Sequence, residues 1–171
     1  MSRRDGRWRS MTVADLPRIG AIAAEVHPAY PEDDAIPAER LRLYPAGCLA
    51  LERDGSVEAY VVSHPWRALA PPKLNTLLGA LPSPATTYYV HDLALLPAVR
   101  GEGHAAAAVD LLVREARRAR LLSMSLIAVN GSVPFWSGQG FTVVQDTVLA
   151  DVLTAYDSEA AYMVRNLPGW A

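Results

Sequence analysis

The chain has 171 residues, and because a domain usually has roughly 100–200 residues we expect a single domain over residues 1–171. Hydrophobic residues make up 51% and charged residues 20% of the chain, which is enough apolar surface for a core and excludes a disordered chain. The formal net charge of −2 gives no overall attraction to nucleic acid or to an anionic membrane, and we expect neither as a partner. The single cysteine, Cys48, excludes an intrachain disulfide, and with four scattered histidines it forms no zinc-site spacing, so we expect no metal.

The start of the chain carries basic residues that are typical of an export signal: Arg3, Arg4, Arg7 and Arg9. Asp15, Pro17 and Arg18 interrupt the sequence before an apolar stretch of export length develops, so no signal peptide is predicted. No uncharged apolar run reaches the ~18 residues that a membrane-spanning helix needs. Together with the single cysteine, these features predict a soluble cytoplasmic protein.

The first third of the sequence predicts a strand, two helices and a β-hairpin. Thr12 offers a helix cap, Asp15 favours the first helical turn, and apolar residues then recur at helical spacing as far as Val26. Asp54-Gly55, between two β-prone runs, is the strongest short hairpin signal. The expected elements are a strand at 7–11, helices at 16–26 and 38–43, and hairpin strands at 47–53 and 57–63.

The remainder of the sequence alternates between strands and helices. Residues 64–84 are rich in proline and predict an excursion over the surface, with a helical turn or two at 74–78. The further elements expected are a strand at 86–96, an amphipathic helix at 103–120, a strand at 122–129, a short turn or helix at 133–138, and strands at 141–148 and 161–166. This order predicts an α/β fold class, with a sheet of mixed direction and helices packed on it.

A glycine-containing segment, Arg100-Gly101-Glu102-Gly103-His104-Ala105, lies between a predicted strand and a predicted helix. Glycines allow a close backbone approach, and the helix start presents unpaired N–H groups with a positive dipole end, so the segment predicts a site for a phosphate or pyrophosphate. The alternative is a plain helix entry in which the glycines serve only the turn.

Two other phosphate-binding families are tested by the same segment. A Walker loop would end in Gly-Lys-Ser/Thr, which is absent. A dinucleotide fold is the nearer competitor, because Gly101-x-Gly103-x-x-Ala106 matches its glycine pattern. That fold needs an acidic residue about 20 positions further on, whereas residues 116–145 contain no Asp or Glu. The dinucleotide hypothesis is therefore the weaker one.

Two motifs together resemble the GNAT superfamily of acyl-CoA-dependent N-acetyltransferases. Arg100-x-x-Gly103-x-Ala105 is similar to its Arg/Gln-x-x-Gly-x-Gly/Ala signature. Asn130 and the later run from Phe135 to Phe141 are similar to its Asn…Phe-Tyr/Trp-x-x-x-Gly-Phe segment. The resemblance covers residues 12–166 and implies the family's mixed, mostly antiparallel twisted sheet flanked by helices.

The resemblance implies acetyl-CoA as the cofactor and assigns roles to individual residues. Backbone N–H groups of the loop would hold the CoA pyrophosphate: Arg100, Gly101, Glu102, Gly103, His104 and Ala105. The backbone of Leu93 and Leu95 would pair with the pantetheine arm, and Asn130, Phe135 and Trp136 would border the thiol end. Trp136 stands where many members have a tyrosine that protonates the thiolate, and an indole N–H cannot act as that acid. The negative charge of Glu102 counts slightly against the anion site.

Candidate acid–base residues lie mainly on the strand before the glycine loop. Strict alternation would place His91 and Asp92 on opposite sides of that strand, so we expect no direct pair between them. Each is either functional or a satisfied internal hydrogen-bonding group. His64, before Pro65-Trp66, is the third catalytic candidate, with anchoring of the loop as its alternative. Glu25 and His27 at the end of the first helix are weaker candidates, and the run Glu32-Asp33-Asp34 is either an attractant for a cationic amine or a solvated loop.

The leading hypothesis is an N-acetyltransferase that moves an acetyl group from acetyl-CoA to a primary amine, by direct attack in a ternary complex. One rival keeps the fold but acts as a non-catalytic acyl-CoA-binding module, and the other is the dinucleotide-binding oxidoreductase. The acceptor is a small molecule or a peptide amine that no motif identifies. The sequence leaves open whether the chain forms a homodimer.

Overall fold

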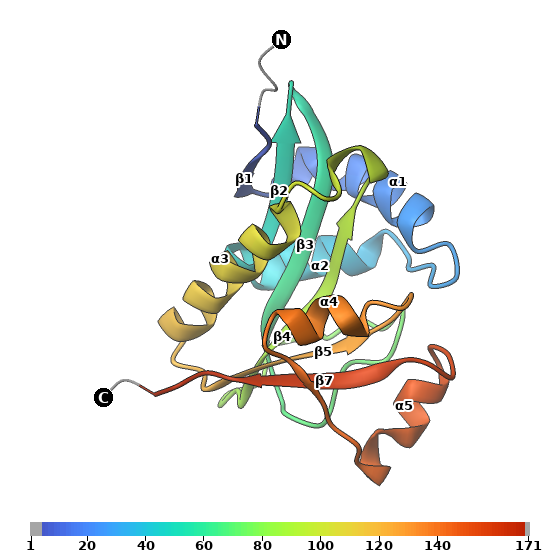
Figure 1. Cartoon of the computed structure of the whole chain (residues 1–171), viewed down its shortest axis with the longest axis vertical. Coiled ribbons are helices and arrows are strands. Elements are labelled where there is room, and N and C mark those ends of the chain that lie inside the picture. The colour runs from blue at the N-terminus through green and yellow to red at the C-terminus, as the bar shows by residue number, and fades with distance from the viewer. Residues whose placement is uncertain (1–4, 170–171) are drawn as a thin grey trace.

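The computed structural model describes residues 5–169, so Arg3 and Arg4 of the basic start lie outside the described residues. The strands are β1 (Arg7–Ser10), β2 (Cys48–Arg53), β3 (Ser56–Trp66), β4 (Thr87–Leu95), β5 (Ser123–Ala128), β6 (Thr142–Val143) and β7 (Ala161–Asn166). The α-helices are α1 (Leu16–Val26), α2 (Ala35–Leu43), α3 (His104–Arg118), α4 (Val133–Gly138) and α5 (Ala150–Thr154). Their arrangement is shown in Figure 1.

The described strands form one seven-stranded sheet in the order β1-β2-β3-β4-β5-β7-β6. β4 and β5 pair in parallel, and every other pair of neighbours in this described sheet is antiparallel. The predicted fold class, an α/β fold with a mixed and mostly antiparallel sheet, is confirmed. The parallel pair requires a crossover between its strands, and α3 supplies it.

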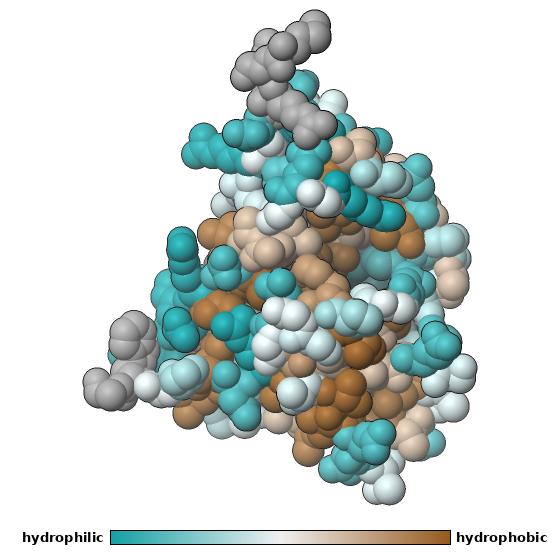
Figure 2. Space-filling model, viewed as in Figure 1, coloured by the Kyte–Doolittle hydropathy of each residue, from teal (hydrophilic) through white to brown (hydrophobic). Residues whose placement is uncertain are grey.

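Helices cover both faces of the sheet because each face carries its own apolar cluster. On one face, α3 and α4 pack on residues that include Tyr88, Val90 and Leu126. On the other face, α1 and α2 pack on residues that include Tyr60 and Val62. The view in Figure 1 looks onto α3 and α4, and the space-filling view of the same side carries hydrophobic residues across its middle (Figure 2). Burying these clusters against helices supplies the main stabilisation of the layers.

β4 and β5 separate part-way along their length. Their parallel pairing covers only Tyr88–Val90 of β4 against Met124–Leu126 of β5. Beyond that point β4 continues beside β3 as far as Leu95, and β5 continues beside β7. The backbone of each strand past the split therefore faces the other across an opening rather than across a hydrogen-bonded ladder.

A β-bulge in β4 lies at the same split. Val62 pairs with Asp92 and Ser63 pairs with Val90, so His91 is the extra residue. The expectation that His91 and Asp92 point in opposite directions is wrong, because a bulge interrupts the alternation of side chains. Val90 packs with the α3 cluster, whereas His91 and Asp92 both line a cavity on the α1 side.

Several elements differ from the sequence-based prediction for identifiable reasons. α2 begins at Ala35 rather than residue 38, because Pro37 lies in the first turn, where an N–H has no intrahelical acceptor. β3 continues through Pro65 to Trp66. The Trp66 carbonyl accepts from Thr86 on the β4 side, so the backbone of Pro65 faces away from β4 and its missing N–H costs no ladder bond.

The C-terminal third of the chain differs further from the sequence-based prediction. The strand expected at 141–148 is reduced to Thr142–Val143, and the chain then forms a 3-10 turn at Thr147–Leu149 and α5, which was not predicted. The Asp146 carboxylate accepts a hydrogen bond from the Val148 N–H and so begins this helical segment. The helical turn expected at 74–78 does not form.

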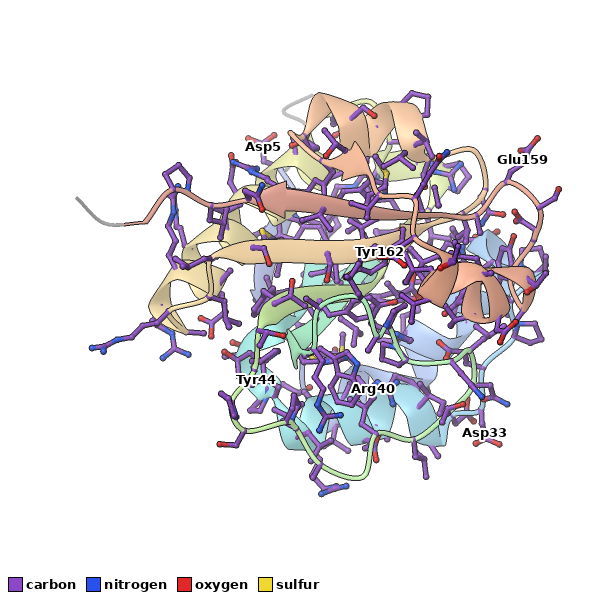
Figure 3. All side chains as sticks on the ribbon, turned by 90° about the horizontal axis from the view of Figure 1, so that it is seen from below. Asp5, Asp33, Arg40, Tyr44, Glu159 and Tyr162 are labelled. Atoms are coloured by element: carbon purple, nitrogen blue, oxygen red, sulfur yellow. The ribbon has the colours of Figure 1, made fainter. Side chains whose placement is uncertain are left out.

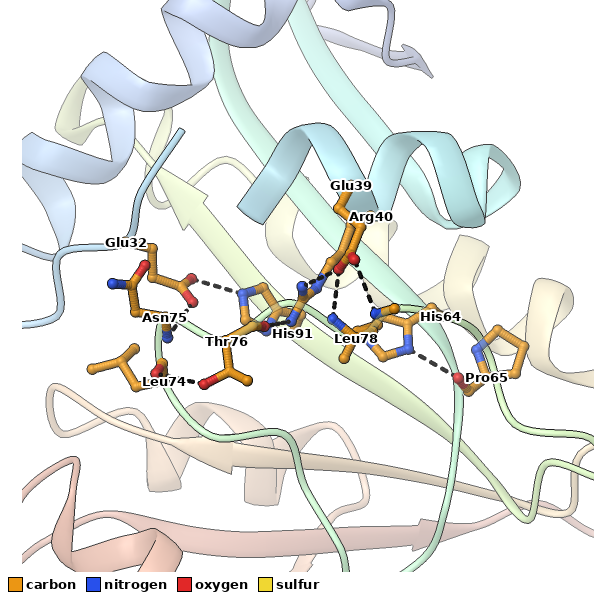
Figure 4. Close-up of polar contacts among 11 residues, drawn as sticks. Glu32, Glu39, Arg40, His64, Pro65, Leu74, Asn75, Thr76, Leu78 and His91 are labelled. Carbon is orange, nitrogen blue, oxygen red and sulfur yellow. Dashed lines mark hydrogen bonds and ion pairs between the residues drawn. The ribbon is translucent and has the colours of Figure 1, made fainter. Parts of the chain in front are cut away.

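The proline-rich segment is held instead by carboxylates of the α1–α2 region. Glu39 of α2 accepts hydrogen bonds from the backbone N–H groups of Leu78 and Gly79, at 2.7 and 3.0 Å. Arg40 is fully buried, pairs with Glu39 at 2.9 Å and donates to the Thr76 carbonyl at 3.1 Å. Figure 3 shows Arg40 on α2, and Figure 4 shows its contacts with the loop. A buried guanidinium is tolerated here because it is paired and hydrogen-bonded.

Arg40→Met should therefore destabilise the fold by about 3 kcal/mol, because it leaves the buried Glu39 carboxylate without its cation. The free energy of unfolding from urea titration measures this. Arg42→Met, at an exposed position on the same helix, is the matched control and should stay within about 0.5 kcal/mol of wild type. Equal losses in the two variants would contradict the role of the buried pair.

Candidate active site

The opening between β4 and β5 contains a cavity of about 600 Å³, called here the β4–β5 cavity. It collects residues from the end of β4, the glycine loop, the start of α3, the end of β5 and α4. All but one of the residues expected to bind the cofactor line it, namely Leu93, Leu95, Arg100, Gly101, Gly103, His104, Ala105, Asn130, Phe135 and Trp136. Glu102 is the exception. The tertiary structure thus brings both sequence motifs to one cavity.

The glycine loop forms the end of this cavity that suits an anion. Gly101 and Gly103 have φ values of +75° and +86°, a left-handed conformation that favours glycine. A Cβ atom at either position would meet nothing within 4 Å, so the loop leaves an open cradle in front of its backbone. α3 begins at His104, and the N–H groups of its first turn have no hydrogen-bond acceptor within the helix. This arrangement fits a phosphate or pyrophosphate.

Glu102 counts less against the anion site than its charge alone suggests. Its carboxylate lies 3.4 Å from the Arg53 guanidinium of β2 and 3.5 Å from the His104 ring. Arg53 also donates to the Ala98 carbonyl, which fixes it beside the loop. The negative charge of Glu102 is therefore partly balanced by a cation that the sequence motif does not contain.

The middle of the cavity suits an extended chain with amide groups. Past Val90, β4 has no β5 partner, so its backbone beside Leu93 and Leu95 borders the cavity, where the Leu95 carbonyl accepts a hydrogen bond from the Arg100 side chain at 2.9 Å. This geometry fits addition of a pantetheine arm as an extra strand. Trp136 is 7% exposed and packs edge-on against Phe135 and Phe141, with ring centroids 4.9 and 5.3 Å away. Its indole contributes to the core as well as to the cavity wall.

A histidine–carboxylate pair lies where the cavity reaches α1. The Nε2 atom of His27 is 2.8 Å from an Asp92 carboxylate oxygen. The Tyr60 hydroxyl donates to the other Asp92 oxygen, and the Asn130 side-chain nitrogen is 2.9 Å from His27 Nδ1. Four residues from α1, β3, β4 and the loop after β5 thus form one connected polar group. His27 is a weak candidate from the sequence alone, because a histidine at the end of a helix shows no local sign of a partner on a distant strand.

A second histidine–carboxylate pair lies next to the first. His91 Nε2 is 2.7 Å from a Glu32 oxygen, and Glu32 also accepts a hydrogen bond from the Asn75 backbone N–H (Figure 4). Glu32 comes from the acidic run after α1, so that run is not simply a solvated loop. Glu25, by contrast, is exposed and lines none of the cavities described here.

The two pairs shift the pKa values of His27, Asp92 and Glu32 in the expected directions. Burial lowers the pKa of His27, but the hydrogen bond and charge of Asp92 outweigh it, so the pKa lies above its usual 6.5. Burial raises the pKa of Asp92, and His27, His91 and the Tyr60 hydroxyl together lower it below its usual 3.8. Burial likewise raises the pKa of Glu32, but the contact with His91 outweighs it and the net shift is downward.

His64 is not brought to this site. It is fully buried, its Nδ1 lies 2.9 Å from the Pro65 carbonyl, and it lines neither the β4–β5 cavity nor the cavity beneath α1 described next. Burial lowers its pKa to about 3, so it is neutral at physiological pH. The structure favours the loop-anchoring alternative for His64.

A second cavity, of about 270 Å³, lies beneath α1 and is called here the α1 cavity. Its walls come from α1, the loop that follows it, the start of α2, and the adjoining parts of β3 and β4. It shares His27, His91 and Asp92 with the β4–β5 cavity. Two ligands, one in each cavity, would therefore meet at the histidine–carboxylate pairs.

The described residues 5–169 contain no group of three or more His, Cys, Asp or Glu side chains placed to hold a metal ion. Over the same range, every helix is too short or too polar to cross a membrane.

A family model described as acetyltransferase (GNAT) family matches residues 11–141 of the chain. No curated protein sequence is significantly similar to it. Many solved structures have the same fold as this chain, and three of them share little sequence identity with it.

A GNAT-like decarboxylase in complex with isobutyryl-CoA has a TM-score of 0.78 and 17% identity, over 95% of this chain and 100% of that one. The loading GNATL domain of CurA from Lyngbya majuscula has a TM-score of 0.79 and 9% identity, over 95% and 98%. The ribosomal-protein-S18-alanine N-acetyltransferase of Escherichia coli has a TM-score of 0.66 and 14% identity, over 98% and 97%. At these identities the likeness establishes the fold alone.

The geometry of the His27–Asp92 pair predicts a specific titration. The Asp92 carboxylate stabilises the imidazolium form, so the Cε1 proton of His27 should titrate in NMR with a midpoint above 6.5. Asp92→Asn removes that charge and should lower the midpoint. Glu32→Gln, which removes a weaker and more distant charge, is the control and should lower it less. His64 should stay neutral down to a pH of about 3. An unchanged His27 midpoint in Asp92→Asn would contradict the pairing.

Proposed function

The chain belongs to the acetyltransferase (GNAT) family, and from that premise we propose that it transfers an acetyl group from acetyl-CoA to a primary amine by direct attack in a ternary complex. The observation that carries the proposal is the meeting of the β4–β5 cavity with the α1 cavity at His27, His91 and Asp92. One cavity has the shape and donors for the CoA thioester, and the other leaves room for an acceptor. The acetyl group would then lie beside groups that can move a proton.

Acetyl-CoA is the acyl donor. Backbone N–H groups of the glycine loop and of the first turn of α3 hold its pyrophosphate, and the β4 backbone beside Leu93 and Leu95, which has no β5 partner, holds its pantetheine arm. The thiol end then lies towards Asn130 and Trp136, next to His27. Holding donor and acceptor together in line supplies much of the rate, because the thioester is already reactive.

The proton balance of the reaction suits a single histidine. The amine nitrogen attacks the thioester carbonyl carbon, the C–S bond breaks, and the amine proton must finally reach the thiolate sulfur. In neutral His27 the proton lies on Nε2, 2.8 Å from the Asp92 carboxylate, and the Nδ1 lone pair accepts a hydrogen bond from the Asn130 side-chain amide until the acceptor amine takes its place. We assign His27 Nδ1 as the proton acceptor, with Asp92 as the positioning residue that holds the ring and stabilises its charge.

The same histidine provides an acid for the leaving group. An indole cannot protonate the thiolate, and Trp136 occupies the position where a tyrosine is common in the family. The imidazolium formed on His27 can return its proton to sulfur as the C–S bond breaks, which makes the missing tyrosine unnecessary. His91, paired with Glu32, borders the acceptor side of the junction.

The fold alone leaves the reaction open, because similar structures include a GNAT-like decarboxylase. A non-catalytic acyl-CoA-binding module is the second alternative. Release of the CoA thiol from acetyl-CoA distinguishes the N-acetyltransferase from the decarboxylase and from the binding module. An N-acetyltransferase releases CoA only when an amine acceptor is present. Release that does not depend on an amine, or binding of acetyl-CoA without release, would contradict the proposal.

The role of the glycine loop is tested by CoA binding. Ligand at about 100 times its Kd should stabilise the protein by about 2.7 kcal/mol, seen as a higher Tm. Gly103→Asp places a negative charge in the open cradle and should abolish this shift. Gly103→Asn has the same shape and tolerance of positive φ without the charge, and should retain part of it. Gly55→Asp, in the remote β2–β3 turn with φ of +79°, controls for backbone strain. A full CoA shift in Gly103→Asp would place the pyrophosphate elsewhere.

The role of His27 is tested by pH-dependent kinetics with one acceptor. The rate kcat/KM should rise as the pH passes through the raised pKa of His27, because only the neutral ring accepts a proton. His27→Gln should lower kcat by roughly 10²–10⁴-fold. Asp92→Asn lowers the His27 pKa, so its rising limb should move to lower pH, whereas titration of the amine itself would leave the limb in place. Near-normal kcat in His27→Gln, with CoA binding intact, would show that solvent removes the proton.

A further inference from the structure

Apart from the two histidines, the ionisable groups that give the α1 cavity its charge are carboxylates. Three carboxylates line it, those of Glu32, Asp34 and Asp92. Within residues 5–169, no lysine or arginine lines this cavity. The nearby Arg40 is turned away to Glu39 and Thr76 and is fully buried. An anionic group on a ligand would therefore find no lysine or arginine partner here.

The negative sign of the cavity does not depend on the protonation of its histidines. His27 is paired with Asp92, and His91 with Glu32, so each imidazolium would at most balance its own carboxylate. Asp34 forms no such pair, and its side chain lies at the exposed start of α2. With both rings charged the lining keeps one negative charge, and with both neutral it keeps three. A cationic ligand is favoured in either state.

The remaining walls suit a small apolar body. Ile19, Ala23 and Ala24 of α1 line the cavity, and Val62 of β3 lines it too. Gly20 in the middle of α1 also lines it, and a Cβ there would meet only an Asp34 oxygen at 3.4 Å. Glycine weakens a helix, so Gly20 does not stabilise α1. Its lack of a side chain instead leaves room in the cavity. The volume of about 270 Å³ suits a compact ligand.

We propose that the α1 cavity binds the acceptor, and that the acceptor is a small cationic alkyl- or arylalkylamine without a carboxylate or phosphate group. This inference rests on the proposed function and specifies its substrate class. The ammonium group is drawn in by Asp34 and Glu32 and first releases one proton to solvent. The neutral amine then gives its second proton to His27 as it attacks, while the apolar body lies against α1. An amino acid would place its carboxylate among three others, which costs binding energy because like charges repel at close range.

Matched pairs of acceptors test the inference directly. Tyramine and tyrosine, histamine and histidine, and cadaverine and lysine each differ by a single carboxylate. Within a pair, kcat/KM for acetylation should be higher for the amine without the carboxylate by about tenfold or more. Tyrosinamide, which keeps the size of tyrosine but carries no negative charge, should be used nearly as well as tyramine. Amino acids that are equal to or better than their amines would overturn the inference and leave the proposed function standing.

Variants of the cavity give a second, independent test. Asp34→Lys adds a cation to the lining and should shift the tyramine-to-tyrosine ratio of kcat/KM towards tyrosine, whereas Asp33→Lys, at a neighbouring exposed residue outside the cavity, should leave it unchanged. Gly20→Leu should fill the cavity, raise KM for tyramine and leave CoA binding intact, since Gly20 does not line the β4–β5 cavity. An unchanged ratio in Asp34→Lys, or an unchanged KM in Gly20→Leu, would place the acceptor elsewhere. Bound CoA with no thiol release for any amine in the panel would overturn the proposed function itself.

Discussion

The separation of β4 from β5 is the constraint on which the rest of the site depends. A continuous parallel ladder would satisfy the backbone of both strands and close the middle of the sheet. Pairing ends at Val90 and Leu126, so the strand backbones beyond it face a cavity, and the glycine loop and α4 come to its two sides. The strands are held apart by their other neighbours, because β4 stays paired with β3 and β5 stays paired with β7.

The bulge at His91 lies at the point where β4 and β5 separate. It sends His91 and Asp92 to the same side of β4, where His27 and Glu32 reach them from the end of α1 and the loop after it. Buried charges are costly unless they are paired, and here each carboxylate has its own imidazole. The pairs therefore satisfy a structural requirement and also concentrate titratable groups where the two cavities meet. Perturbed pKa values occur at functional sites as well as in structural ion pairs.

The proline-rich segment between β3 and β4 supports this arrangement from outside. Glu39 and Arg40 fix residues 76–79 against α2, and Glu32 joins the Asn75 backbone to His91. The segment is thus bound both to Glu39 of α2 and to Glu32, which lines the α1 cavity. Movement of this loop would therefore disturb the Glu32–His91 pair, which borders the α1 cavity.

The amino-acid sequence by itself determined the α/β class, the hairpin at Asp54-Gly55, the helix after the glycine loop and the two motifs of the family, because these depend on local periodicity, turn chemistry and short spacing. Nearly every residue that the motifs predict for cofactor binding lines the β4–β5 cavity, since those motifs are continuous in the chain. Only the tertiary structure decided the partners of Asp92 and His91, the interior position of His64 and the appearance of α5. The pairing of His27 with Asp92 joins a helix end to a bulged strand, and both the contact and the bulge arise from packing between segments far apart in the sequence, which no local pattern records.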